Sequence, residues 1–319
     1  KEIELTVKDD GVNRDDLTVA VGLRSPQGAV LGSAAVHTYT ILNTTPEPAV
    51  TFTVASQQVK ESGGSATIGV ELSSLSGKDV TVPFSVSGTS KPKGNYTITP
   101  GPVVIKAGTK SASITVQAAA NGMNEDDKTV VVSMGMPEHG VQGKTAASTV
   151  TIVNTDPAPA VSFGSASSSG EERISPVRLE VVLSAASGKP VQVGYGVKGG
   201  TAVRGKDYAL PGGVLAFEPG ETKKTLVVDI RSSGTYKDDK TLELVLQDPK
   251  NAVLGTGTVH SHTIVNIAPQ PAVAFLRANS RSAGKPGPAR LEVGLSVPSG
   301  KPVRVEYGVV GGTAEEGKQ

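Results

Sequence analysis

Four short sequence markers recur along the chain in one register, and this repetition limits the fold more than any other feature. The markers are Pro-Ala-Val-x-Phe from Pro48, Pro159 and Pro271, Ser-Gly-Lys from Ser76, Ser187 and Ser299, Asp-Asp-x-Thr from Asp15, Asp126 and Asp238, and a closing Asn43, Asn154 and Asn266. Each marker returns after 111 residues and again after 112. Self-similarity at a fixed period is typical of repeat architectures. The 319 residues therefore indicate an array of similar domains, each about 111 residues long.

Within each period, apolar residues alternate with small or polar ones, which is the pattern of a strand with one buried face. The alternation is clear in 80–86, 191–197 and 303–309, and similar runs cover 66–72, 111–116, 128–134 and 148–153. Clusters of Gly, Pro, Asn and Asp separate the runs, and no segment has a helical period. We expect an all-β fold of tandem antiparallel β-sandwiches in a linear array, with about seven strands in each.

Composition argues against several classes of function. The chain contains no cysteine, which excludes disulfides, thiolate metal sites and cysteine nucleophiles. Its 31 basic residues nearly balance its 30 acidic ones, and aromatic residues make up 3%, so we expect no nucleic-acid partner. The longest apolar runs are too short to predict a membrane span. Because no Ser-His-Asp set and no phosphate-binding glycine loop recurs, we expect that the protein is not an enzyme.

The register of the markers also predicts the domain boundaries. Residues 46–156 and 157–268 are expected to be complete domains, whereas 1–45 would be the C-terminal half of one and 269–319 the N-terminal half of another. Half a sandwich leaves strand edges open, so we expect both ends to continue in a longer array or to pair between neighbouring chains. Proline-marked linkers at 45–48, 156–159 and 268–271 favour extended, semi-rigid joints.

Several motifs together resemble the Calx-beta repeat family. They are Val59-Lys60-Glu61, Gly200-Thr201-Ala202, Gly205-Lys206-Asp207-Tyr208, Phe217-Glu218-Pro219-Gly220-Glu221-Thr222, Asn251-Ala252-Val253-Leu254-Gly255 and Thr263-Ile264-Val265-Asn266. The resemblance covers essentially the whole chain, and it implies a seven-stranded, immunoglobulin-like sandwich. The family is similar to regulatory domains of sodium–calcium exchangers and to modules of integrin subunits and large bacterial surface proteins. A tandem array of this kind resembles a segment of a large bacterial surface protein.

In exchanger-like members of the family, a cluster of carboxylates at one end of the sandwich holds calcium, an ion that prefers six to eight oxygen ligands. The resemblance places candidate ligands at Glu61, Glu125, Asp126 and Asp156 in one domain, Asp207 in the next, and Asp9 and Asp10 in the first segment.

The same comparison shows where the calcium pattern is broken. Asn95 and Asn121 each replace an acidic residue, Lys237 brings a positive charge, and the last segment has Gly284-Lys285 and Gln319 at ligand positions. The expected cofactor is therefore none. The favoured interpretation is a set of solvated polar loops at a decayed site, with calcium binding as the alternative.

Two other possibilities concern single side chains. His260 and His262 are two residues apart in a predicted strand, so they share a face and form a candidate zinc or copper site. The sequence favours exposed histidines at a strand end over a metal site. Lysine–asparagine cross-links are a further alternative that the sequence leaves open.

These features favour a structural function. We expect a repeat segment of an extracellular or cell-surface stalk, adhesin or filament, in which sandwiches form a semi-rigid rod. The expected partners are neighbouring repeats of the same protein, by self-assembly, and a surface or matrix ligand. The alternatives are a calcium-binding or calcium-stiffened regulatory module and a ligand-recognising adhesion domain.

Overall fold

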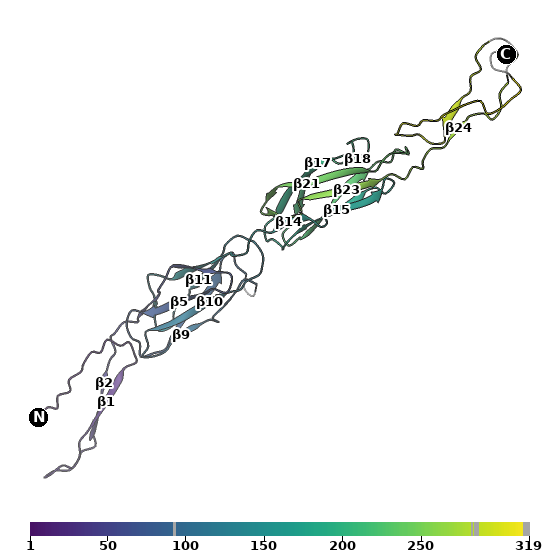
Figure 1. Cartoon of the computed structure of the whole chain (residues 1–319). Helices are drawn as coiled ribbons and strands as arrows, with labels where there is room; N and C mark the ends of the chain where they lie inside the picture. The colour runs from purple at the N-terminus through teal and green to yellow at the C-terminus, as the bar shows by residue number, and fades with distance from the viewer. Residues whose placement is uncertain (92–93, 282, 284–286, 315–319) are drawn as a thin grey trace. The chain divides into compact units, whose positions relative to one another are not determined.

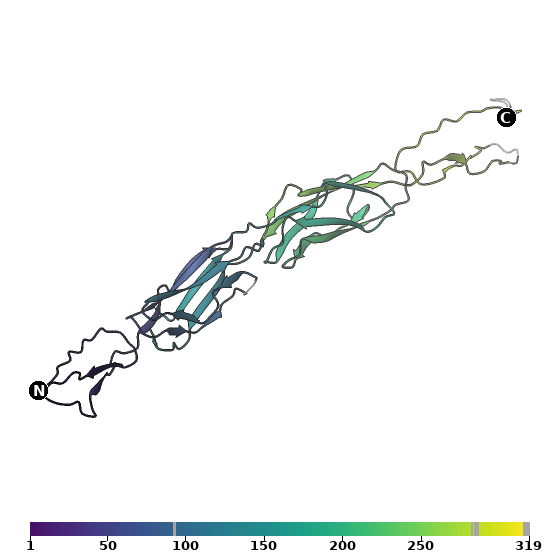
Figure 2. The ribbon, with the colours of Figure 1, turned by 90° about the horizontal axis from the view of Figure 1, so that it is seen from below.

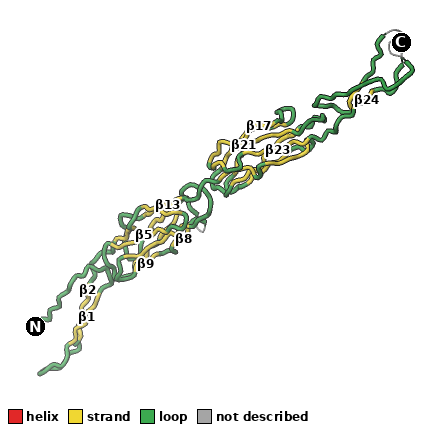
Figure 3. Tube along the Cα trace, viewed as in Figure 1, coloured by secondary structure: helices red, strands yellow, loops and turns green. Residues whose placement is uncertain are grey.

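The computed structural model describes residues 1–91, 94–281, 283 and 287–314. The described chain consists of strands and loops without a helix (Figure 3). No helix in this part of the chain has the length and apolarity needed to cross a membrane. The chain divides into two compact units, Lys1–Pro157 and Ala158–Gln319. Each unit contains one complete β-sandwich and one shorter β-hairpin segment (Figure 1).

The sandwich of the first unit has a five-stranded sheet, β12-β3-β5-β10-β8, and a four-stranded sheet, β4-β13-β11-β7. Two further short strands, β6 and β9, pair with each other. The strands are β3 (Ala49–Phe52), β4 (Ser56–Lys60), β5 (Ser65–Leu72), β6 (Val80–Val82), β7 (Phe84–Ser87), β8 (Tyr96–Ile98), β9 (Val103–Ile105), β10 (Ser111–Ala118), β11 (Lys128–Met134), β12 (Val141–Gln142) and β13 (Ala147–Val153).

The sandwich of the second unit has two five-stranded sheets, β18-β20-β16-β14-β22 and β15-β23-β21-β17-β19. This sandwich is drawn in teal to green in Figure 2. Its strands are β14 (Ala160–Phe163), β15 (Ser167–Glu171), β16 (Val177–Leu183), β17 (Val191–Gly200), β18 (Tyr208–Ala209), β19 (Gly213–Phe217), β20 (Lys223–Ile230), β21 (Lys240–Lys250), β22 (Val253–Leu254) and β23 (Val259–Val265). The predicted β-sandwich fold is thus confirmed, with the alternating runs forming its strands.

Most strand pairs are antiparallel, but each sandwich is closed by parallel pairs. The first stretch of chain contributes to both sheets: β3 and β14 pair with β12 and β22, while β4 and β15 pair with β13 and β23. The closing strands therefore run beside the opening ones. This pairing covers strand edges that would otherwise be open, and it brings the end of the first strand next to the end of the last.

The alternation seen in the sequence places one side of each strand in a core between the sheets. In β5 and β10, every second residue is buried, including Ile68 and Ile114, and Val130 of β11 faces them from the other sheet. Leu226 and Leu244 occupy the same roles in the second sandwich. Each sandwich has its own core cluster, and burial of apolar area contributes about 25 cal/mol per Å² to its stability.

The run 80–86 is divided into β6 and β7, which differs from the single strand expected. Pro83 lies between them and lacks the N–H that a continuous ladder needs, so β6 pairs with β9 while β7 pairs with β11. The corresponding run in the second sandwich has no proline at this point and forms the unbroken β17.

The two remaining segments each contain one hairpin. In the first, β1 (Leu17–Gly22) pairs with β2 (Val36–Ile41), and in the last, β24 (Val273–Phe275) pairs with β25 (Val293–Leu295). The strand expected over 303–309 is not formed, and Tyr307 is 95% exposed. Its counterpart β17 pairs with β19 and β21, and among the described residues after 269 no strand pairs with 303–309.

Candidate functional site

A buried glutamate lies at the same end of both sandwiches. Glu61 follows β4 and Glu172 follows β15, and the backbone N–H of each donates 2.9 Å to the carbonyl of Val153 or Val265 at the end of the closing strand. The parallel pairing of opening and closing strands thus positions both side chains. They are 2% and 1% exposed, so each carboxylate needs partners within the protein. The neighbouring Glu171 is only partly buried, so Glu172 is the counterpart of Glu61.

The closing asparagine of each repeat supplies one of these partners. Asn154 Nδ2 donates to Glu61 Oε2 and Asn266 Nδ2 donates to Glu172 Oε1, both at 3.1 Å. The same amide groups also donate 3.0 Å to the carbonyl of Met123 or Thr235 in the loop that precedes the Asp-Asp marker. A neutral amide therefore ties the glutamate to this loop.

The second aspartate of the Asp-Asp marker completes this arrangement. The backbone N–H of Asn154 donates 2.9 Å to Asp127 Oδ1, and that of Asn266 donates 2.8 Å to Asp239 Oδ1. The first segment repeats the contact between Asn43 and Asp16 at 2.8 Å. Two of the four sequence markers are therefore joined by one hydrogen bond in every repeat.

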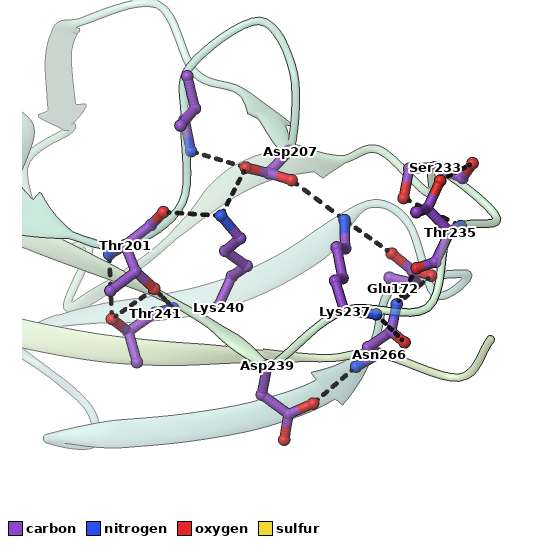
Figure 4. A network of polar contacts seen from close by, with 11 residues as sticks. Glu172, Thr201, Asp207, Ser233, Thr235, Lys237, Asp239, Lys240, Thr241 and Asn266 are labelled. Carbon is purple, nitrogen blue, oxygen red and sulfur yellow. Dashed lines mark hydrogen bonds and ion pairs between the residues drawn. The ribbon is translucent and has the colours of Figure 1, made fainter. Parts of the chain in front are cut away.

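In the second sandwich, a lysine occupies the middle of the polar cluster (Figure 4). Lys237 Nζ lies 3.1 Å from Asp207 Oδ1 and 3.3 Å from Glu172 Oε2, and Lys240 Nζ lies 3.9 Å from Asp207 Oδ2. The lysine side chain is 14% exposed. Two ammonium groups thus face two buried carboxylates, so the charges balance within the chain.

The pKa of Asp207 reflects this balance. Burial acts to raise it, but the hydrogen bonds from the Val203 N–H and Lys237, with the nearby charges of Lys237 and Lys240, outweigh burial and lower the pKa below its ordinary value of 3.8. A lowered pKa in the folded state means that the contribution to stability is present above pH 3.8 and is lost as the pH falls below it. The contacts in this cluster therefore favour the ionised form of Asp207.

In the first sandwich, the buried carboxylates are paired less completely. In register, Glu125 stands at the position of Lys237 and Asn95 at that of Asp207. Lys128 pairs with Glu125, but Glu61 Oε1 and Asp156 Oδ2 are buried without a hydrogen-bond partner. Burial first, and then the charges of Asp156 and Glu125, raise the pKa of Glu61 above its ordinary value of 4.5. Three carboxylates therefore meet here with one lysine close to them.

The remaining candidate ligands are not part of such a cluster. Asp126 is exposed at the rim of the small pocket that Glu61 and Glu125 line. Asp9 and Asp10 lie in the first segment, where each accepts a hydrogen bond from the backbone N–H two residues later. That is the geometry of a local turn.

The positions aligned with Asp10 have the same turn function. Asn121 Oδ1 accepts from the N–H of Met123 at 2.8 Å, and Ser233 Oγ accepts from that of Thr235 at 3.3 Å. The residue type varies because carboxylate, amide and hydroxyl oxygens all accept this bond.

The described residues contain no group of three or more His, Asp or Glu side chains arranged to hold a metal ion. In the second sandwich the residues do not fit a calcium ion, because the Lys237 ammonium already lies between the carboxylates. In the first sandwich, the unpartnered oxygens of Glu61 and Asp156 fit a cation better. The ligand positions at Gly284, Lys285 and Gln319 lie outside the described residues.

His260 and His262 are buried, so the expectation of exposed strand-end histidines was wrong. They are 1% and 3% exposed, because both fall on the inward face of β23. His260 Nε2 lies 2.7 Å and His262 Nδ1 lies 2.8 Å from the hydroxyl of Ser168, and His260 Nδ1 lies 2.7 Å from the carbonyl of Ser165. Burial, and secondly the neighbouring His260, lower the pKa of His262 below its ordinary value of 6.5.

A model of the Calx-beta domain matches this chain twice, over residues 43–156 and 154–271. The chain belongs to the Calx-beta domain family. The two matches meet where one repeat's closing strand is followed by the next repeat's opening strand.

The curated relatives of these Calx-beta repeats include two human proteins. FRAS1-related extracellular matrix protein 1 is 34% identical over 88 residues, which cover 27% of this chain, and Extracellular matrix organizing protein FRAS1 is 29% identical over 171 residues, which cover 50%. The chain spans only 4% of the length of either relative.

Solved structures of similar fold include the crystal structure of CBD12 from CALX1.2. It is 18% identical, with a TM-score of 0.33, over 68% of this chain and 99% of that one. The calcium binding domain CBD12 of CALX1.1 is 17% identical, with a TM-score of 0.32, over 67% and 98%.

We predict that neutralising the two glutamates has opposite effects. Glu172→Gln leaves the buried Lys237 with one carboxylate fewer and should destabilise the second sandwich by about 3 kcal/mol at pH 7. Glu61→Gln removes a charge whose folded-state pKa is raised, so the first sandwich should keep or gain stability at pH 7. Ionisation of the buried Glu61 should make the first sandwich less stable as the pH rises above about 4.5, and this loss should be absent in Glu61→Gln. Hydrogen exchange with mass spectrometry reports on β11 and β21 separately and measures both effects. Equal destabilisation by the two substitutions would contradict the assignment.

The histidine pair predicts a pH response confined to the second sandwich. Because the pKa of His262 is lowered on folding, its contribution to stability is present above about pH 6.5 and is lost as the pH falls below it. Calorimetry should show that the melting temperature of the second sandwich falls as the pH is lowered from 7.5 to 5. The first sandwich, which has Ser148 and Val150 at these positions, is the internal control and should not lose stability as the pH falls, because the raised pKa of Glu61 acts in the opposite direction. Transferring those residues as His260→Ser with His262→Val should remove the fall in the second sandwich, whatever the substitutions do to the melting temperature at pH 7.5.

Proposed function

We propose that this chain is a structural segment of an extracellular assembly, such as a surface stalk, adhesin or filament, built from serially joined Calx-beta sandwiches. The observation that supports this most is that each complete repeat has its own core and closes its polar end with its own side chains. Two relatives carry extracellular matrix in their names. Calx-beta domains are binding or regulatory modules and not catalytic ones, which agrees with a function that is not enzymatic.

The same proposal includes the division into domains. Residues 46–156 and 157–268 are complete repeats, and the segments 1–45 and 269–319 are halves whose apolar side chains are covered by the rest of a repeat. Apolar side chains in both halves are exposed, which supports this division. About half or more of the surface is accessible to solvent in each of Leu17, Val36, Leu291 and Val293. The proposed partners are neighbouring repeats and, as a second class, a surface or matrix ligand.

Location is the most direct test of this function. Antibodies against the chain, labelled with gold, should mark material outside the plasma membrane of intact cells that produce the protein. Electron microscopy of that material should show elongated particles. The proposal fails if the label appears only after the cells are permeabilised.

Binding of calcium at the first sandwich is a second candidate function. The unpartnered, buried oxygens Glu61 Oε1 and Asp156 Oδ2 favour it, together with the raised pKa of Glu61 beside Asp156 and Glu125. Glu61 and Asp156 would contribute oxygen ligands, and the ion would supply positive charge to offset the carboxylates of this cluster. The second sandwich lacks this need because of Lys237.

This candidate predicts a calcium response in one repeat only. Calcium should raise the melting temperature of the first sandwich relative to chelator, while the second sandwich melts unchanged. Glu61→Gln should abolish the shift, and Glu172→Gln serves as the matched control, because it alters the equivalent glutamate of the other repeat. Equal melting of the first sandwich in calcium and in chelator would remove the candidate.

A further inference from the structure

The Ser-Gly-Lys marker does not contribute to the core of its own sandwich. In the first unit, Ser76–Lys78 lies against the loop Val12–Asp15 of the preceding repeat. Asn13 and Ser76 form a parallel β-bridge, and the N–H of Gly77 donates 2.7 Å to the Asn13 carbonyl. Lys78 Nζ lies 2.6 Å from Asp15 Oδ1. Three consecutive residues thus contact one loop.

The second unit forms the same contact independently. Tyr236 and Ser299 make a parallel β-bridge, the N–H of Gly300 donates 2.8 Å to the Tyr236 carbonyl, and the N–H of Tyr236 donates 3.0 Å to the Pro298 carbonyl. Lys301 Nζ pairs with Asp238 and lies 5.3 Å from the centre of the Tyr236 ring. The first aspartate of the Asp-Asp marker is therefore the ion-pair partner of the next repeat's lysine in both units.

The glycine of the marker is favoured by the close approach of the preceding repeat and not by its own backbone conformation. Neither Gly77 nor Gly300 has a positive φ. A Cβ on Gly77 would lie 2.9 Å from Arg14 Cβ, and one on Gly300 would lie 3.3 Å from both Lys237 Cβ and the Tyr236 carbonyl. An added Cβ would thus force a shift at Gly77 and a displacement of a few tenths of an ångström at Gly300, and the atoms that must move belong to the preceding repeat.

The serine holds the turn in shape. Ser76 Oγ accepts from the Lys78 N–H at 3.0 Å and donates to the Lys78 carbonyl at 2.8 Å, and Ser299 makes the same two bonds with Lys301 at 3.1 and 2.8 Å. Exposed ion pairs contribute little to stability, and Asp15 and Asp238 are both largely exposed. Backbone hydrogen bonds and close packing therefore provide most of the contact, while the lysine orients it.

The loop that receives the turn is braced from inside in the second unit. Lys237 points inward to Glu172 and Asp207, and the Thr235 carbonyl accepts from Asn266 (Figure 4). The neighbouring Tyr236 and Asp238 instead contact the next repeat. Consecutive residues of one loop thus alternate between the internal charge cluster and the contact with the next repeat.

We propose that the Ser-Gly-Lys turn and the loop before the Asp-Asp marker are the two halves of a joint that holds successive repeats together. The partner of the loop is a second copy of the repeat, which recognises it through the turn. This inference rests on the proposed structural function and specifies how its repeats are fixed. In the second unit, side chains of the chain itself hold the loop in place.

Distance measurements between spin labels test the joint in the full chain. The absence of cysteine allows labels at introduced cysteines alone: Thr18→Cys with Lys110→Cys across the first joint, and Lys198→Cys with Glu292→Cys across the second. All four positions are exposed. Each pair should give one narrow distance distribution, and Gly77→Ala or Gly300→Ala should broaden it at least twofold at its own joint only.

Gly196→Ala is the matched control, since Gly196 also has an ordinary φ but no atom within 4 Å of an added Cβ. It should leave both distributions narrow, and melting of the two sandwiches should be unchanged by all three alanine substitutions. Broad distributions in the parent chain, or narrow ones in Gly77→Ala and Gly300→Ala, overturn the joint. Those results would contradict the joint but not the extracellular structural function. Gold label found only inside cells would contradict that function but not the joint.

Discussion

A carboxylate buried at the end of the opening strand must be matched by partners, and this requirement organises the polar end of each sandwich. The backbone of Glu61 or Glu172 is bonded to the closing strand, and its side chain is buried at the end of the sandwich. The amide of the closing asparagine then joins it to the loop before the Asp-Asp marker. The buried carboxylate thus helps to position this loop in each sandwich, and in the second sandwich Tyr236 and Asp238 of the loop also contact the segment that follows.

The two complete repeats satisfy this requirement with different residues. In the second, Lys237 supplies the positive charge from within the chain, which ties the loop to Glu172 and Asp207. In the first, Glu125 replaces that lysine, and Glu61 remains in a site where its ionised form is disfavoured. A single position in the loop thus decides whether the end of a Calx-beta repeat is neutral by itself or carries excess negative charge.

Much of this fold could be predicted from the sequence, because burial in a sheet has a period of two that remains visible in single residues. Runs such as 128–134 match their strands closely. The same pattern cannot show whether partner strands are present, so 303–309 was assigned wrongly. It also cannot show that a polar residue faces inward. His260 and His262 alternate correctly for the core, but their chemistry suggested the surface, and their shared partner Ser168 is 92 residues from the nearer of them in sequence.

Each of the two sandwich repeats contains the residues of both halves of the proposed joint. The Ser-Gly-Lys turn lies near its start, and the loop before the Asp-Asp marker lies near its end. Each repeat is therefore a self-compatible unit, in the sense that any copy presents the surface that any other copy accepts. A gene encoding such units can lengthen or shorten by whole repeats without a compensating substitution at the new boundary. Variation in copy number among related chains would then change the number of domains in the array, while the chemistry of each boundary stays constant.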